Sequence, residues 1–310
     1  MKSRILSFSA IIMASMFFLV SCQKDKSTSS NDYTTESNTH SDDQARFSGE
    51  LDAIDNDANA AMEVTAGFTG RPGDIQNLIC DADIVVDTAS NPRTISITYN
   101  GSNCLGGHTR TGVVVISMAQ GVRWKNAGAV VTVSAQNLKI TRTSDNKSIT
   151  INGTHTYTNV TGGLLVNLPQ LQTITHTITS NGMSVTFDNG NQRTWQVARR
   201  RVFTYNNGVV ITTTGTHTEG NVSGITEWGT NRFGNAFYTA IVEPLVNRQD
   251  CSFRLGSGKL THTTSFYTAT ATFGLNAAGA ATSCPGLGAY YMKVEWTGPA
   301  GNTHSTLIPY

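Results

Sequence analysis

The stretch Thr173-Ile-Thr-His-Thr-Ile-Thr179 has threonine at every second position and a larger, less polar side chain between. Successive side chains of a β-strand point to opposite faces of its sheet, so this spacing predicts a strand with one hydroxylated face. The same period of two recurs at 94–99, 113–117, 130–133, 148–151 and 268–273. Asn-Gly, Gly-Gly and Gly-Ser-Gly breaks separate these runs, as β-hairpins require. The sequence therefore predicts a mainly β fold, either an antiparallel β-sandwich or a large curved open sheet.

One short helix is predicted ahead of the strands. Apolar residues recur there at steps of three and four, which places them on one helical face: Phe47, Leu51, Ile54, Ala58, Ala61 and Met62. Ser41 is a suitable N-cap, and Gly67 with Gly70-Arg71-Pro72-Gly73 is expected to end the helix. This amphipathic helix, with an acidic outer face, is expected to dock on the sheet.

Composition and charge exclude several classes of protein. Only 14% of the 310 residues are charged and the net charge is +1, whereas an average soluble domain is about 25% charged. A nucleic-acid-binding protein carries a strong positive excess, so no nucleic acid is expected as a partner. The charge is divided along the chain: residues 22–63 hold 3 basic and 10 acidic side chains (net −7), and residues 64–310 hold 17 and 11 (net +6). The basic body is therefore a suitable partner for the acidic helix.

The N-terminus has the features of an export signal. Lys2 and Arg4 precede an uncharged apolar stretch at 5–20, which is short for a bilayer span and predicts a signal peptide over residues 1–21. Leu19-Val20-Ser21-Cys22 resembles the lipobox of bacterial lipoproteins, and the alternative is an ordinary secretory signal followed by a chance cysteine. The resemblance implies that Cys22 carries several acyl chains, which would anchor the protein stably to a membrane.

After Cys22 we expect a flexible tether at 22–43 and one domain of helix and antiparallel strands at 44–310. The tether is rich in Ser, Thr and Asn and cannot bury enough apolar surface to fold alone. Its first residues, Gln23-Lys24-Asp25-Lys26, resemble the Lys-plus-acid signal that sends lipoproteins of the Bacteroidota to the outer face of the outer membrane. We therefore expect a lipid-anchored protein of the outer membrane at the cell surface, with the periplasmic face of that membrane as the alternative.

Two echoes within the sequence indicate an internal repeat. Residues 149–162 align without a gap on residues 211–224. In the second echo, a Thr-rich strand precedes Cys104 and another precedes Cys284, and each of these cysteines has an earlier neighbour, Cys80 and Cys251. Four cysteines allow three disulfide connectivities, and the echo favours Cys80–Cys104 with Cys251–Cys284. A metal site is not expected from the cysteines, because the chain has no Cys-x-x-Cys spacing.

This layout resembles the uncharacterised surface lipoproteins of the Bacteroidota. The shared features are the lipobox, a short acidic helix, a Thr-rich β body and two cysteine pairs. The resemblance implies a cell-surface location and a β fold. It implies no activity that can be transferred to this chain.

Four Thr-flanked histidines are the most informative candidates for a binding site: His155, His176, His217 and His262. Period-two counting places each ring on the less polar face of its strand. If their strands lie close together, the four imidazoles would line one cleft and bind zinc or copper. The alternative is that each ring is half-buried near the edge of a curved sheet, hydrogen-bonded to a neighbouring threonine.

Three consecutive arginines, Arg199, Arg200 and Arg201, interrupt the alternation between 195–197 and 202–205. They cannot all face one way on a strand, so the sequence predicts a bulge or an edge there. Guanidinium groups bind anions in a bidentate manner, which makes a phosphate or sulfated-sugar site one interpretation. The alternatives are a charge-protected edge strand and a dock for the acidic helix.

The sequence contains none of the common catalytic motifs: no His-Glu-x-x-His, P-loop, dinucleotide fingerprint or Gly-x-Ser-x-Gly elbow. We therefore expect no enzyme and no cofactor, but a lipid-anchored envelope module that binds a glycan, a lipid or an envelope protein, or that has a structural role. One alternative is a surface polysaccharide-degrading hydrolase, which needs two carboxylates flanking a bond. The other is a carrier that holds a lipid or a metal on a His-lined concave face.

Overall fold

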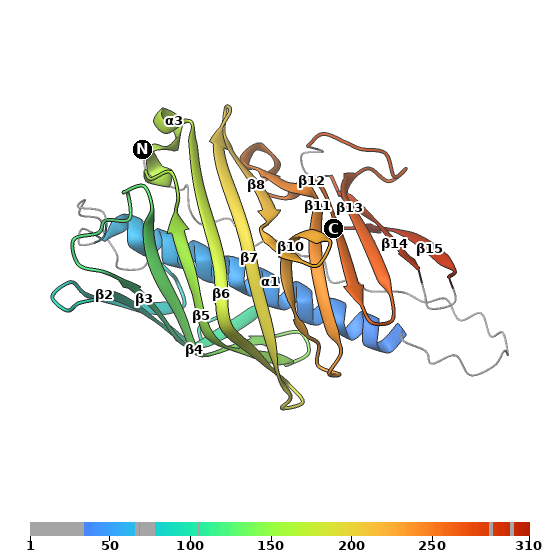
Figure 1. Ribbon diagram of the computed structural model, residues 1–310, viewed down its shortest axis with the longest axis horizontal. Coiled ribbons are helices and arrows are strands. Elements are labelled where there is room, and N and C mark those ends of the chain that lie inside the picture. The colour runs from blue at the N-terminus through green and yellow to red at the C-terminus, as the bar shows by residue number, and fades with distance from the viewer. Residues whose placement is uncertain (1–33, 66–67, 69–77, 104–105, 285–287, 298–300) are drawn as a thin grey trace.

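The strands form one continuous antiparallel sheet (Figure 1). The computed structural model describes residues 34–65, 68, 78–103, 106–284, 288–297 and 301–310. Within these residues the strands are β1 (Ala82–Asp87), β2 (Arg93–Asn100), β3 (His108–Met118), β4 (Ala129–Arg142), β5 (Ser148–Asn159), β6 (Thr173–Phe187), β7 (Gln192–Tyr205), β8 (Val209–Gly215), β9 (His217–Glu219), β10 (Val222–Thr230), β11 (Ala236–Arg248), β12 (Leu255–Thr264), β13 (Thr268–Leu275), β14 (Tyr291–Thr297) and β15 (Thr303–Pro309). The mainly β, antiparallel prediction is confirmed, and of its two architectures the large curved sheet is the one observed.

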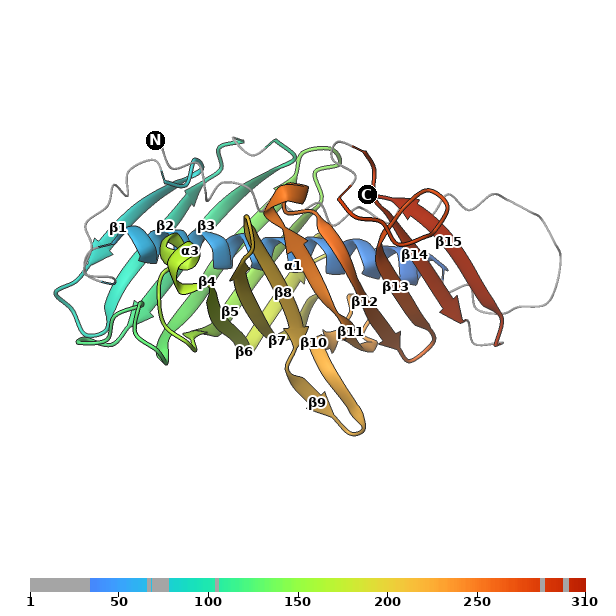
Figure 2. The same ribbon diagram turned by 90° about the horizontal axis from the view of Figure 1, so that it is seen from above.

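Neighbouring strands in the sheet are almost always neighbours in the chain, because hairpins connect them. The order runs β1 to β7, then β10 to β15. The exception lies between β7 and β11, where β8 and β10 follow one another along a single slot: β8 pairs with 199–205 of β7, and β10 pairs with 195–197. The short β9 pairs with β10, and this hairpin projects from the body of the protein (Figure 2).

A long helix, α1 (Thr34–Val64), lies along the concave face of the sheet (Figures 1 and 2). It contacts β3 as well as β7 and β10, so the sheet curves around it. The predicted apolar face of the helix is confirmed, because its six residues are each at most 1% exposed: Phe47, Leu51, Ile54, Ala58, Ala61 and Met62. Together with apolar side chains of β2 to β7 and β11 they form the main core of the protein.

The helix is longer than predicted. Residues 34–43, which were expected to belong to the tether, are already helical, so Ser41 lies inside α1 and is not its N-cap. The added turns are held by tertiary packing rather than by local signals, since His40 and Asp43 are both fully buried against the sheet. The residues expected to end the helix, Gly67 and 70–73, lie outside the described residues, as do the predicted signal peptide, Cys22 and residues 22–33.

Threonine and serine cover the convex face of the sheet. One row of directly paired residues crosses five strands, from β2 to β6, and every member carries a hydroxyl: Thr94, Ser117, Thr132, Thr156 and Thr179. All five side chains are half-buried or exposed. The hydroxylated strand face that the sequence predicts is therefore the outer surface.

A second, smaller apolar cluster lies beyond α1. It is built on β13 and β14 from Ala271, Phe273, Met292 and Val294. The remaining elements are short: η1 (Leu165–Asn167), α3 (Leu168–Leu171) and η2 (Gln249–Cys251). Within the described part of the chain, none of the helices combines the length and the apolar composition that a membrane span needs.

The two segments of the gapless sequence echo have different structures. Residues 149–159 belong to the uninterrupted strand β5, whereas 211–224 cover the end of β8, all of β9 and the start of β10. Gly153 is accommodated at a bulge between β5 and β6. Gly215 instead ends β8, where a Cβ atom would lie 2.0 Å from the carbonyl oxygen of Gly224. This echo is therefore not a structural repeat.

The predicted disulfide between Cys251 and Cys284 is confirmed, with the two Cα atoms 5.2 Å apart. It fastens η2 to the segment between β13 and β14. Cys80 is also disulfide-bonded, and its predicted partner, Cys104, lies outside the described residues.

Candidate functional site

The eight acidic side chains of α1 all contact the sheet or its connecting loops. The partners are Asn231 and Asn235 for Glu36, Arg142 for Asp42, Arg232 for Asp43, His108 for Glu50, Arg199 and Arg201 for Asp52, His155 and Arg201 for Asp55, Arg110 and Tyr99 for Asp57, and the N–H groups of Leu165 and Val166 for Glu63. The expected acidic outer face is therefore wrong: because the sheet curves around α1, the acidic side chains also meet the sheet.

The centre of this interface is a buried cluster of charges. Asp55 is fully buried, and its Oδ1 lies 2.7 Å from Nε2 of His155 and its Oδ2 lies 3.6 Å from a guanidinium nitrogen of Arg201. Burial alone raises the pKa of a carboxyl, but the facing charges of His155 and the arginines outweigh it and hold the pKa of Asp55 below its ordinary value. Arg199 joins Asp52 of the helix to Glu227 of β10. These groups therefore fix the position of the helix.

A second charged cluster surrounds Arg110 near the C-terminal end of the helix. Both oxygens of Asp81 accept hydrogen bonds from Arg110, at 2.6 and 2.7 Å, and Oδ2 of Asp57 accepts another at 2.8 Å. Glu50 lies next to this cluster, 3.5 Å from Nε2 of His108. Burial raises the pKa of Glu50 to about 7, although the charges of Arg110 and Arg46 oppose the rise. Glu50 is thus an acid of the interface whose pKa lies near neutral pH.

The N-terminal half of α1 inserts an aromatic side chain into the sheet. The ring of His40 packs against Trp195, Phe237 and His262, with centroids 4.6 to 5.7 Å away. Burial lowers the pKa of His262 to about 4, and burial also lowers the pKa of His40. Both imidazoles are therefore neutral at pH 7.

The structure does not bring the four predicted histidines together. His155 pairs with Asp55, His176 accepts or donates a 2.9 Å hydrogen bond with the hydroxyl of Tyr157, and His262 bonds in the same way to Thr239 at 2.8 Å. His217 lies on the projecting hairpin and stacks on Trp228, with centroids 3.9 Å apart. Only His262 has the threonine partner that the alternative interpretation expected.

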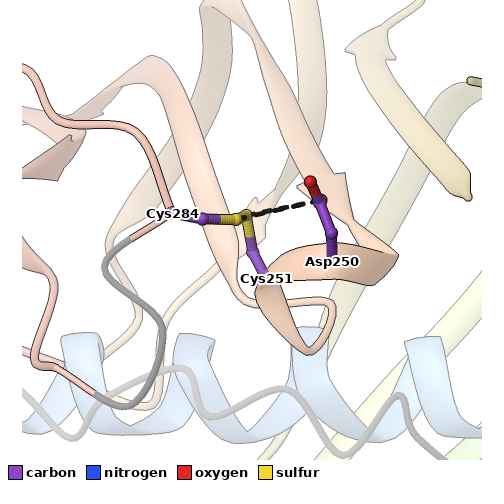
Figure 3. A group of neighbouring side chains, drawn as sticks. All are labelled: Asp250, Cys251 and Cys284. Carbon is purple, nitrogen blue, oxygen red and sulfur yellow. Dashed lines mark hydrogen bonds between the residues drawn. A yellow bond between two sulfur atoms is a disulfide. The ribbon is translucent and has the colours of Figure 1, made fainter. Parts of the chain in front are cut away.

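The described residues contain a single group with a metal-ligating composition, and it involves none of these histidines. Figure 3 shows Asp250, Cys251 and Cys284, with Oδ1 of Asp250 3.7 and 3.8 Å from the two sulfurs. The sulfurs are joined in the disulfide. Both oxygens of the Asp250 carboxylate accept hydrogen bonds from Arg248, so no member of the group is a free ligand. This geometry is that of a structural cross-link.

The three consecutive arginines lie on an interior strand, and the predicted bulge or edge at this point is wrong. Residues 199–201 of β7 pair with β6 on one side and with β8 on the other, in unbroken register. Arg199 and Arg201 are buried on the concave face, where they bind α1, and Arg200 is exposed on the convex face. Of the interpretations offered by the sequence, the dock for the acidic helix is the one observed; no single anion site contains all three guanidinium groups.

Beside this dock, a groove opens between α1 and the sheet. Its polar lining consists of Asp52 and Asn56 from the helix, Arg201 from β7, Thr213 from β8 and Asn247 from β11, and Phe203 supplies an aromatic wall. The groove is small, with a cavity volume of about 40 Å³. It lies over β8, at the slot that this strand shares with β10.

A scan against protein-family models, a search of curated proteins and a search of solved structures each found no match to this chain.

Sequence reasoning missed most of the interface. The sequence predicts that the acidic side chains of α1 face the solvent. It gives no motif that identifies Glu227, Arg110 or Arg142 as residues that bind the helix. One signal was present: the net charge of −7 at 22–63 and of +6 at 64–310. A charge split of this size between a helix and its sheet is expected when the two bind each other through ion pairs.

Proposed function

We propose that the protein is a lipid-anchored module of the bacterial cell envelope that binds an envelope component or has a structural role, and that it is not an enzyme. The anchoring part rests on the sequence 19–22 and its likeness to a lipobox. The observation that favours a module over a carrier is the docking of α1: the helix of the same chain fills the concave face and bonds to it through its eight acids. A lipid would have to displace these ion pairs to occupy that face.

The same observation disfavours the hydrolase alternative. Asp57 and Asp81, two carboxylates that lie close together, both bind Arg110, and Asp81 is 1% exposed. An acid and a nucleophile for glycoside hydrolysis must instead flank an accessible bond. The carboxylates of this region hold α1 in place.

Metabolic labelling with a palmitate analogue tests the anchoring. We expect the wild-type protein to be labelled and to remain with the outer membrane, and the Cys22→Ala variant to lose both the label and the membrane association. Added protease should digest the wild-type protein on intact cells if it faces outward. Labelling that persists in Cys22→Ala, or wild-type protein released without detergent, would contradict the proposal.

A further inference from the structure

We infer that residues 119–130 and 160–172, which we call the α3 rim, bind an anionic lipid surface. The two segments are the connections that follow β3 and β5, with the first residues of β4, and they lie at one edge of the sheet (Figure 1). They are in direct contact, because the N–H of Gly163 donates to the carbonyl oxygen of Lys125 at 2.8 Å. The inference adds a second membrane contact to the proposed anchor and does not depend on it.

Exposed apolar side chains are concentrated at the α3 rim. Seven large apolar side chains of the described chain are exposed, and the three outside the rim lie apart from one another on β1, in the β10–β11 turn and on β11. The other four belong to the rim and are each 44–47% exposed: Val130, Val160, Val166 and Leu171. A concentration of exposed apolar surface marks a place where the protein meets another phase or molecule.

The segment that carries these side chains is held firmly to the protein. The N–H groups of Leu165 and Val166 donate to the buried carboxylate of Glu63, at the end of α1. Leu168 is fully buried in a small apolar cluster and fixes α3 to the sheet. Val166 and Leu171 lie two and three positions away from it in the chain, and both are 46% exposed. They cannot be buried in the core unless these contacts break.

The charges of the α3 rim favour an anionic partner. Arg123 and Lys125 are exposed, and neither forms an ion pair with any residue that the structure describes. The two segments of the rim contain no acidic residue, and neither does the next connection along this edge, 206–208. Anionic headgroups can therefore approach the two cations without meeting a carboxylate of the rim.

Acidic side chains in other turns of the sheet are bound by neighbours. Four such pairs are Asp87 with Ser90, Asp145 with Arg142, Asp188 with Arg232, and Asp250 with Arg248. The exposed cations of the α3 rim have no partner of this kind among the described residues. Free positive charge therefore coincides with exposed apolar surface at this edge.

A lipid surface fits this combination better than a protein does. Peripheral membrane binding gains both from apolar side chains buried at the acyl boundary and from cations that attract anionic lipids. The centres of protein interfaces are instead enriched in tryptophan and tyrosine, whereas leucine and valine are under-represented among their strongest contacts. Trp124, the aromatic residue of the rim, is fully buried, and the exposed apolar side chains are all aliphatic.

The test uses the mature chain with Cys22→Ala, which has no acyl group, so that binding reports the α3 rim alone. Flotation with vesicles of phosphatidylcholine, with and without phosphatidylglycerol, measures the fraction bound. Val166→Asp and Leu171→Asp change the apolar part of the rim. Val242→Asp is the matched control, because Val242 is 59% exposed on β11. Near-UV circular dichroism checks that each variant keeps its tertiary structure.

The cations are tested in the same way. Arg123→Ser and Lys125→Ser each remove one positive charge from the rim. Lys139→Ser is their control, because Lys139 is an exposed residue near the other end of β4. Each cation near an anionic lipid surface strengthens binding by about fivefold, so each rim variant should weaken it by about that factor. Lys139→Ser should have no effect.

We expect the chain to bind the vesicles that contain phosphatidylglycerol, and Val166→Asp or Leu171→Asp to weaken binding by about tenfold each, because half of an apolar side chain is no longer buried. Val242→Asp should bind as before. The inference is overturned if the vesicles are not bound, if neutral vesicles bind equally well, if Val242→Asp and Val166→Asp have equal effects, or if Val166→Asp dissociates a dimer of the chain instead. A negative result here with successful palmitate labelling of Cys22 would refute the lipid-binding rim alone and leave the proposed anchor standing.

Discussion

The part of the sheet that α1 covers and the part beyond it, β13 to β15, use charged residues in opposite ways. Under the helix the charges are internal: the side chains of Arg110 and Asp81 are 2% and 1% exposed, and both bind inside the protein. Beyond the helix they are external, as in the pair of Lys293 and Glu295, whose side chains are 42% and 40% exposed. There, the Cys251–Cys284 disulfide and a small apolar cluster provide the cross-strand support.

This difference shows how a chain with few charges distributes them. An ion pair in solvent contributes little, typically 0 to about 1 kcal/mol, because water screens it. A buried charge must have its partner, since an uncompensated one is strongly destabilising. Charges that dock α1 therefore determine where the helix lies, whereas charges on β14 hardly affect the fold. The convex surface is left to threonine and serine.

The largest effect on the free energy of unfolding is expected from Arg110→Met, which removes the ion pairs of Arg110 in the covered region. It leaves Asp81 and Asp57 buried without their cation, and removing one partner of a buried pair costs about 3–5 kcal/mol. Urea unfolding followed by circular dichroism measures the loss. Lys293→Met, the matched control in the uncovered region, should change the free energy of unfolding by less than about 1 kcal/mol. Equal losses in the two variants would remove the distinction between the two regions.

A somewhat smaller effect is expected from the double substitution Cys251→Ser and Cys284→Ser, which acts on the uncovered region. The disulfide closes a loop with a sequence separation of 33, and its loss should destabilise this part by about 2–4 kcal/mol. Hydrogen exchange locates the change: protection should fall in β12 to β14 and persist in β3 to β7, where α1 holds the sheet. A uniform loss of protection along the chain would show that the two regions unfold as one.

The smallest effect is expected on the pH dependence of stability, and it comes from Glu50 in the covered region. The pKa of Glu50 is about 7 in the folded protein, raised by burial from 4.5. Between these two values the folded state holds a proton that the unfolded state releases, so this group lowers stability as pH rises from 4.5 to 7. Glu50→Gln should remove that fall. Between pH 4.5 and 7 the free energy of unfolding of the variant, measured with urea, should therefore rise by about 1–2 kcal/mol relative to that of wild type.

The comparison with wild type is needed because the buried histidines act in the opposite direction. The pKa of His262 is lowered to about 4, so the unfolded state binds more protons and stability is lost as pH falls from about 6.5 toward 4. Glu295→Gln on the exposed surface of β14 is the control. Its free energy of unfolding should change with pH in the same way as that of wild type. A Glu50→Gln curve that runs parallel to wild type would show that Glu50 ionises freely.

The fold class could be predicted because it depends on local periodicity. The alternation of 173–179 and the three-four spacing from Phe47 to Met62 identify strand and helix, and the structure confirms both. The direction of the acids on α1 was not predictable in the same way. It depends on the curvature of the sheet, which puts β3 and β7 on both sides of the helix, and curvature arises from strand twist and bulges over many residues.

The candidate site was predicted only in part for a related reason. Arg199 and Arg201 were identified as candidates, and the helix dock was among their interpretations, because charge complementarity is visible in the sequence. The groove was not foreseen, since Asn56, Thr213 and Asn247 come from three elements that meet only when β8 takes its place beside β7 and β11. Because these polar residues belong to no sequence motif, their proximity in the folded protein cannot be predicted from the sequence.

The docking of α1 also has a consequence for the order of events during folding. The helix leaves the ribosome before any strand, yet Glu36 and Gln44 bond to residues 195 positions later in the chain. Contacts of such separation form late, because a long loop must close first. The N-terminal turns of α1 precede every strand in the chain and are therefore among the last parts to be secured. Before β11 is complete, β2 to β7 can already accept the C-terminal half of the helix, but Gln44 in its N-terminal half still lacks its partner Thr239.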